Sequence, residues 1–181
     1  VVVQSSNTIA AGAWADGADA ILTTYLPGQE GPRIIAEVLT GVTNPSGKLT
    51  QTWPRSNEDT PVTDSEEHYL KREIGYTEDG DWRIHLTEGI FFGYRWYDRY
   101  SVEPLFPFGH GLSYTEFEYE DLTIEQEGED LMISLKVRNT GDRKGDEIVQ
   151  VYLGKAEAPA WIQMAEKQLC GYARVRGLEP G

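Results

Sequence analysis

The 181-residue chain has little cysteine, little positive charge and no long apolar run. Its single cysteine, Cys170, excludes a disulfide within the chain and a cysteine-rich zinc site. Its 16 Lys and Arg against 30 Asp and Glu give a formal charge of −14, which argues against nucleic acid and anionic membrane surfaces as partners. No apolar run approaches the roughly 20 residues of a transmembrane helix. The 39% of hydrophobic residues nevertheless fits a folded protein rather than a disordered one.

Both ends of the sequence predict a piece of a longer protein. The chain opens on three valines, a pattern typical of a buried strand, and no signal peptide precedes them. It closes on Leu-Glu-Pro-Gly at 178–181, a turn with no strand after it. We therefore expect a fragment whose compartment cannot be inferred, because an export signal would have stood at the missing N-terminus.

The first half of the sequence alternates strand and helix signals. Residues 1–3, 18–26 and 48–53 predict strands. Between the last two, an apolar stripe of Ile34, Ile35, Val38 and Leu39 predicts a helix that ends at Gly41. Strand, helix and strand in this order indicate a parallel crossover in an α/β layer. Residues 55–83 are polar and aperiodic, and we expect them to form a long surface excursion.

The last third predicts an all-β structure. Apolar and polar residues alternate over 131–138, and further strands are predicted at 122–125, 147–153 and 167–175. Four strands are about half of a fibronectin-type sandwich, which has roughly seven. Residues 116–130 hold eight acids and no base. We interpret them as a solvated domain junction, with a calcium or partner site as the alternative.

Several apparent catalytic motifs fail on their spacing. The sequence GVTNPSGKL at 41–49 has one residue too many for a phosphate loop and a leucine where a metal-binding hydroxyl is needed, so we interpret it as a turn. No Gly-x-Ser-x-Gly motif is present. His68, His85 and His110 are too far apart for a metal motif, and Cys170 is expected to be a small buried side chain. We predict neither a metal nor a cofactor.

The aromatic segment 88–98 holds the candidate site residues. Glu88 and Asp98 flank an aromatic run with Arg95 and Trp96, and sugars bind to aromatic surfaces that carry a few polar partners. A retaining glycosidase needs two carboxyl groups about 5–5.5 Å apart, whereas ten residues of strand would hold these much farther apart. We therefore assign no catalytic residue, and keep these four as substrate-proximal candidates. A structural salt bridge from Arg95 to Glu88 or Asp98 is the alternative.

Several blocks, taken together and in order, resemble the C-terminal half of glycoside hydrolase family 3, of the β-glucosidase type. They are PGQEG at 27–31 with NPSGKL at 44–49, EGIFFGYRWYD at 88–98, PFGHGLSYT at 107–115, and VRNTG at 137–141 followed by EIVQVYL at 147–153. Pro32 departs from the second glycine usual in that family, but proline is tolerated in the first turn of a helix.

The resemblance implies an α/β sandwich domain, incomplete at its start, over residues 1–113, and a truncated fibronectin type III-like domain over 114–181. It implies a parent enzyme that hydrolyses terminal β-glucosidic bonds with retention, acting on β-glucosides or cello-oligosaccharides. In that family an N-terminal (β/α)₈ barrel supplies the nucleophilic aspartate, and an upstream loop supplies the acid/base glutamate. Neither has a counterpart here, so the resemblance implies a scaffold that forms one wall of the site and is inactive alone.

Three alternatives remain open from the sequence. One is a free-standing carbohydrate-binding or interaction module that uses the aromatic residues Phe91, Phe92, Tyr94, Trp96 and Tyr97. Another is one subunit of a split enzyme, and the third is a β-xylosidase-type member of the same family. A half sandwich would leave an apolar face and an open sheet edge uncovered, so we expect the isolated chain to be marginally stable.

Overall fold

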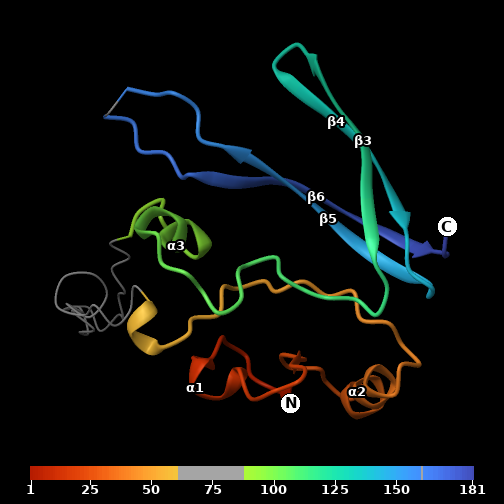
Figure 1. Ribbon diagram of the computed structural model, residues 1–181. Helices are drawn as coiled ribbons and strands as arrows, with labels where there is room; N and C mark the ends of the chain where they lie inside the picture. Colours follow the sequence, from red (N-terminus) through yellow and green to blue (C-terminus); the bar gives the residue numbers. More distant parts are fainter. Residues whose placement is uncertain (61–87, 160) are drawn as a thin grey trace, which may run out of the picture. The chain divides into compact units, whose positions relative to one another are not determined.

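The computed structural model describes residues 1–60, 88–159 and 161–181, and Figure 1 shows the course of the chain. Two compact units are present, and they interleave along the sequence. The first contains residues 1–28, 49–110 and 152–170, and the second contains residues 29–48, 111–151 and 171–181. Each unit is described by itself.

The first unit is built around Trp53. The strands β1 (Val2–Val3) and β2 (Leu22–Thr23) pair in parallel, and the short helix α1 (Gly12–Ala15) lies between them in sequence. The parallel crossover predicted from 18–26 to 48–53 is not observed, because 48–53 is not a strand. Trp53 is only 1% exposed and packs with Ala11 and Ala15. Half-buried apolar residues surround this core: Val3, Ile9, Ile21, Leu49, Leu105 and Phe106.

The predicted strand at 48–53 is wrong. Its backbone instead pairs irregularly with residues 105–110: the N–H of Leu49 donates to the carbonyl of His110 at 2.7 Å, and that of Trp53 to the carbonyl of Phe106 at 2.8 Å. Only Trp53 and Phe106 form a regular bridge, and it is antiparallel. Prolines at 54 and 107 lack an N–H and prevent a continuous ladder. The following helix η1 (Asn57–Asp59) is a single 3₁₀ turn, and the rest of the predicted surface excursion lies largely outside the described residues.

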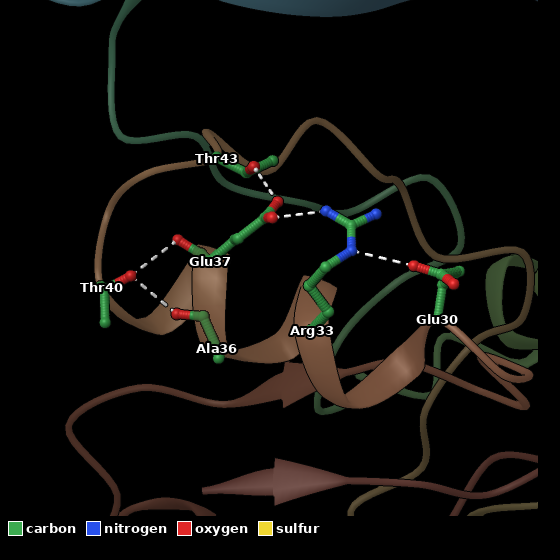
Figure 2. A network of polar contacts seen from close by, with 6 residues as sticks. All are labelled: Glu30, Arg33, Ala36, Glu37, Thr40 and Thr43. Carbon is green, nitrogen blue, oxygen red and sulfur yellow. Dashed lines mark hydrogen bonds and ion pairs between the residues drawn. The ribbon is translucent and has the colours of Figure 1, made fainter.

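The second unit begins with helix α2 (Gly31–Leu39), which confirms the predicted helix. Figure 2 shows the network that stabilises it: the guanidinium of Arg33 bridges Glu30 and Glu37, one turn apart on either side. The hydroxyl of Thr43 donates to Glu37 at 3.0 Å, and this bond together with Arg33 lowers the pKa of that carboxyl. The helix ends where Gly41 takes a φ of +75°, as its sequence position predicted.

A long two-stranded ribbon follows, formed by β3 (Phe117–Glu127) and β4 (Asp130–Asn139) in antiparallel pairing (Figure 1). Most of residues 116–130 is strand, and its side chains are largely exposed, as the interpretation as a solvated segment predicted; its place at a domain junction stays a prediction. Its acids lie beside bases of β4: Arg138 pairs with Glu118 and Glu120 across the ribbon. The opposite face is apolar, and its outer members Leu122, Ile124 and Leu131 are exposed.

One residue adjusts the register of this ribbon. Between Glu120 and Thr123 the pairing shifts, and Asp121 takes a φ of +51°. A bulge of this kind places two residues opposite one and keeps the apolar side chains before and after it on the same face.

The last two strands, β5 (Gly145–Gly154) and β6 (Lys167–Leu178), pair with each other. In the second unit the end of β6 meets the buried side chain of Asn139, which is 1% exposed. Its amide oxygen accepts from the Thr115 hydroxyl at 2.7 Å and the Gly141 N–H at 3.1 Å, and its nitrogen donates to the carbonyls of Arg143 at 2.6 Å and Leu178 at 2.9 Å. All four bonding positions of the amide are used, so Asn139 ties the end of β4 to the end of β6.

The four predicted tail strands are thus confirmed, each longer than its sequence signal. Over the described ranges, no helix has the length and apolar character needed to cross a bilayer. The division of the chain at 113/114 stays a prediction.

Candidate functional site

The candidate segment 88–98 does not form the predicted strand. After Gly93, whose φ is +61°, the chain enters helix α3 (Tyr94–Tyr100), which ends at Ser101 in the left-handed region. Aromatic residues recur through this segment in a pattern that fits a helix as well as a strand. Because a helix rises only about 1.5 Å per residue, the separation assumed for the extended segment between Glu88 and Asp98 does not apply.

Helix α3 is anchored to the start of β6 within the first unit. The Tyr94 hydroxyl accepts a hydrogen bond from the backbone N–H of Leu169 at 2.9 Å. One turn later, Asp98 forms an ion pair with Lys167 at 2.9 Å. The Tyr94 ring also stacks on Phe108, with centroids 5.0 Å apart, and meets the edge of Tyr152 at 6.0 Å. These contacts fix both the position and the rotation of the helix.

The four candidate residues have different environments on this segment. Trp96 is 9% exposed and packs against Tyr97 and Tyr100, so it is a core side chain. Arg95 is half-buried, donates from Nε to the carbonyl of Phe92 at 3.4 Å and lies over the Tyr94 ring. Among the ion pairs of the described residues it has none with Glu88 or Asp98, so the predicted salt bridge is wrong for this part of the chain.

Glu88 and Asp98 each have one carboxylate oxygen that makes no hydrogen bond in the described part of the chain. In the described part of the chain, Oε2 of Glu88 and Oδ2 of Asp98 are buried and have no hydrogen-bond partner. A buried carboxylate oxygen without a donor is energetically unfavourable, so its position in a structure calls for a donor such as a hydroxyl. Both oxygens are shielded from solvent, so a polar ligand would reach them only after the side chains around them had moved, while Lys167 holds the other oxygen of Asp98.

The aromatic residues of this segment do not form a flat platform. Phe91 and Tyr97 are 8% and 7% exposed, Tyr94 is half-buried, and only Phe92 is largely exposed. Burial, together with the negative charge of Asp59, raises the pKa of Tyr97 to about 12. The segment thus packs most of its rings inward, which weakens the interpretation of a free-standing sugar-binding module.

Sequence reasoning missed the role of the turn at 44–48. In the second unit the Asn44 oxygen accepts from the Ser113 hydroxyl at 2.9 Å and the Tyr114 N–H at 2.8 Å, while its nitrogen donates to the carbonyl of Lys144 at 3.1 Å. Such distant partners leave no local signal. The asparagine of a turn thus joins its own segment to two others, one at Ser113 and Tyr114 and one at Lys144.

Lys48 follows the same turn and is largely buried. Its ammonium donates to the carbonyl of Gly111 at 2.7 Å and pairs with Glu147 at 3.1 Å, where the two side chains are 18% and 8% exposed. The Tyr119 hydroxyl donates to the same carboxylate at 3.0 Å. Burial first, and then the charge of Glu147, raise the pKa of Tyr119 to about 12. Lys48 is therefore a structural cation rather than a phosphate ligand.

Other sequence candidates are resolved more simply. Cys170 is exposed, because it alternates with the inward Leu169 on β6, so its predicted burial is wrong. His110 stacks on Phe106 with centroids 5.3 Å apart, while His68 and His85 lie outside the described residues. Within residues 1–60, 88–159 and 161–181, no three His, Cys, Asp or Glu side chains gather as a metal site would require.

Comparison with known proteins gives one consistent result. Residues 1–114 match the model of the glycosyl hydrolase family 3 C-terminal domain. Thermostable beta-glucosidase B of Acetivibrio thermocellus is 40% identical over 93% of the chain, and the match spans 21% of that relative. Probable beta-glucosidase K of Emericella nidulans is also 40% identical, over 93% of the chain and 18% of its own length. The chain thus spans about a fifth of the curated relatives that it matches.

Solved structures agree with the sequence matches. Beta-glucosidase 3B from Thermotoga neapolitana, determined with glycerol, superposes with a TM-score of 0.84 and 38% identity, covering 100% of this chain and 24% of that one. DesR, a beta-glucosidase from Streptomyces venezuelae determined with D-glucose, gives a TM-score of 0.79 and 37% identity, covering 100% and 22%. With the family model matched over more than half of its length, the chain belongs to glycosyl hydrolase family 3, within the C-terminal region of that family.

Proposed function

We propose that the chain is part of a retaining β-glucosidase that removes terminal β-D-glucosyl residues. One observation carries this proposal: the matched relatives and solved structures named above are β-glucosidases, and similarity extends over 93–100% of the chain. The proposed substrates are β-glucosides and cello-oligosaccharides. The proposed partner is an N-terminal (β/α)₈ barrel, which would lie in the part of such enzymes that this chain does not match.

The chain's own contribution is a wall of the site rather than its catalytic pair. Hydrolysis with retention needs a nucleophile and an acid/base held against one sugar. No residue of this sequence corresponds to either in the family, so we propose that the isolated chain is inactive. Residues 1–113 would form the α/β part of this scaffold, and residues 114–181 a fibronectin type III-like part.

Glu88, Arg95 and Asp98 are the proposed substrate-proximal residues of that wall. The spare carboxylate oxygens of Glu88 and Asp98 would accept hydrogen bonds from sugar hydroxyls, and the Arg95 guanidinium would supply a donor. The fourth candidate, Trp96, would not contact the substrate but would hold helix α3 in place by packing against Tyr97.

Complementation tests this proposal. The chain is mixed with the missing part of a related family 3 β-glucosidase, which comprises its barrel and the following segment with the loop that carries the acid/base glutamate. The mixture is assayed with 4-nitrophenyl β-D-glucoside, and with the β-D-xyloside in parallel. We expect no turnover by either part alone and glucoside turnover by the mixture. Turnover by the chain alone, a mixture without activity, or turnover of the xyloside only would each contradict it.

A variant pair then tests the proposed wall. Glu88→Gln should lower kcat/KM of the complemented enzyme at least about tenfold, the loss expected when a charged hydrogen bond to substrate is removed. Glu103→Gln is the matched control, because Glu103 is exposed and belongs to the same unit. Equal activity of the two variants would exclude Glu88 from the site.

A further inference from the structure

The turn at 44–48 directs its polar side chains toward distant parts of the second unit. Asn44 and Lys48 bond to residues within 111–147. Between them in sequence, the Ser46 hydroxyl accepts a hydrogen bond from Nη2 of Arg174 at 2.9 Å. A surface turn ordinarily leaves such side chains to water or to its own backbone, whereas these three reach partners 63 or more residues away. The turn therefore joins segments that are remote in the chain.

The contact of Ser46 is the end of a charged network on β5 and β6. Arg174 donates from Nε at 3.1 Å and from Nη2 at 2.8 Å to the same carboxylate oxygen of Asp146. The other oxygen of Asp146 accepts from the N–H of Gly177 at 2.8 Å. Because Asp146 already holds the guanidinium in place, the bond to Ser46 costs little additional side-chain entropy. This bond ties the turn to both strands.

The backbones of these segments also approach each other very closely. A Cβ atom on Gly111 would lie 2.1 Å from the carbonyl oxygen of Gly47. A Cβ atom on Gly145, where β5 begins, would lie 2.8 Å from a methyl carbon of Thr115 and 3.0 Å from the amide nitrogen of Asn44. Glycine is the residue that permits such an approach, so the turn and the tail pack without room for one more methyl group.

Helix α2, which leads into the turn, has a contact of its own with the tail. The Tyr114 hydroxyl donates to the carbonyl of Val38 at 2.9 Å, and Val38 is 8% exposed. The helix has only nine residues. A helix shorter than about 12–15 residues is marginal by itself in water, so α2 depends on tertiary contacts such as this one.

We propose that residues 29–48 fold and unfold together with residues 115–151 and 171–181, and not with the rest of the region that the family model matches. That match covers residues 1–114 as one domain, yet the bonds of the turn pass beyond it to Lys144, Glu147 and Arg174. The end of the match therefore cuts through a cooperative unit, and the tail stabilises a helix inside the matched domain. This inference is independent of the proposed activity, because it rests on contacts within the second unit alone.

Native-state hydrogen exchange of the 181-residue chain, followed by NMR at low urea concentrations, tests the proposal. Three backbone amides report on the relevant parts: Val38 on α2, Thr140 at the end of β4, and Trp53 in the core of the first unit. We expect the amides of Val38 and Thr140 to open with the same free energy and the same urea dependence. The amide of Trp53 should open with different values.

A variant pair tests the attachment itself. Asn44→Ala removes three hydrogen bonds between the turn and the tail. It should lower the protection of Val38 and Thr140 by the same factor, about tenfold or more, and leave that of Trp53 unchanged. Asn7→Ala is the matched control, because it makes the same substitution at an exposed asparagine of the first unit. This control should leave the amides of Val38 and Thr140 unchanged.

Two outcomes overturn the proposal. If Val38 opens with the free energy and urea dependence of Trp53, helix α2 belongs with the rest of the matched domain. If Asn44→Ala lowers the protection of all three amides equally, the chain opens as one unit and residues 29–48 have no separate attachment to the tail. Should Asn44→Ala leave too little folded protein, Ser46→Ala gives the same comparison in a milder form, because it removes only the bond to Arg174.

Discussion

Replacing Asn139 with alanine should cost more stability than any exposed substitution in the second unit. The change removes an amide that makes four hydrogen bonds, to Thr115, Gly141, Arg143 and Leu178. At about 0.5–1.5 kcal/mol net for each bond, the loss is about 2–6 kcal/mol. The site is almost completely buried, so water cannot replace the lost partners and the upper half of that range is expected. Total stabilities of about 5–15 kcal/mol make this a large fraction.

The assay is urea unfolding followed by circular dichroism, with hydrogen exchange at the Gly141 amide as a local readout. The exchange of that amide should accelerate in Asn139→Ala because its acceptor is gone. Thr140→Ala is the control, because Thr140 is next to Asn139 in sequence and its side chain is exposed. The hydrogen bond from the Thr140 backbone N–H to the carbonyl of Glu116 is kept in this variant. An Asn139→Ala variant within about 0.5 kcal/mol of wild type, with unchanged exchange, would refute the reasoning, since that range is typical of surface changes.

Three further outcomes are expected. Lys48→Met should destabilise the fold by about 3–5 kcal/mol because it leaves the buried carboxylate of Glu147 without its cation. In a double-mutant cycle, adding Glu147→Leu should recover most of this loss, whereas additive losses would contradict a buried ion pair. A hydrogen bond from the N–H of Gly177 lowers the pKa of the Asp146 carboxyl below its usual 3.8. The ionised carboxylate therefore stabilises the folded state above pH 3.8, and this stabilisation is lost as the pH falls through the lowered pKa. In Asp146→Asn, the urea midpoint should fall less steeply as the pH is lowered. A pH profile of the urea midpoint identical to that of the wild type would exclude this role of Asp146. Ile124→Lys on the exposed apolar face should reduce light scattering by the concentrated chain, and unchanged scattering would show that this face is not what aggregates.

Much of the architecture could be predicted from local pattern. The strand β4 follows from alternation over 131–138, and α2 follows from an apolar stripe that ends at Gly41. These signals depend on residues close in sequence, so they can be recognised without knowledge of the tertiary structure. The interleaving of the two units has no such signal, because Asn44 and Lys48 act on partners about 63–100 residues away.

The candidate site was harder to predict for a different reason. In 88–98, aromatic residues are spaced so densely that the helical and the extended periods fit equally well, and Gly93 with a positive φ decides for the helix. The sequence located the carboxylates but not their partners, since Lys167 lies 69 residues from Asp98.

The bulge at Asp121 gives the β3–β4 ribbon an unusual sensitivity to chain length. Its signal in the sequence is the doubled acid, Glu120 and Asp121, in an otherwise strict alternation. Deleting one of the two would reverse the facing of every later residue on β3, turning Leu122 and Ile124 toward the charged side of the ribbon. Substitutions at an exposed position such as Asp121 are ordinarily tolerated. In evolutionary terms, this site should therefore accept the residues that tolerate its positive φ, such as glycine and asparagine, while rejecting single-residue insertions and deletions, the reverse of what is expected for a surface loop.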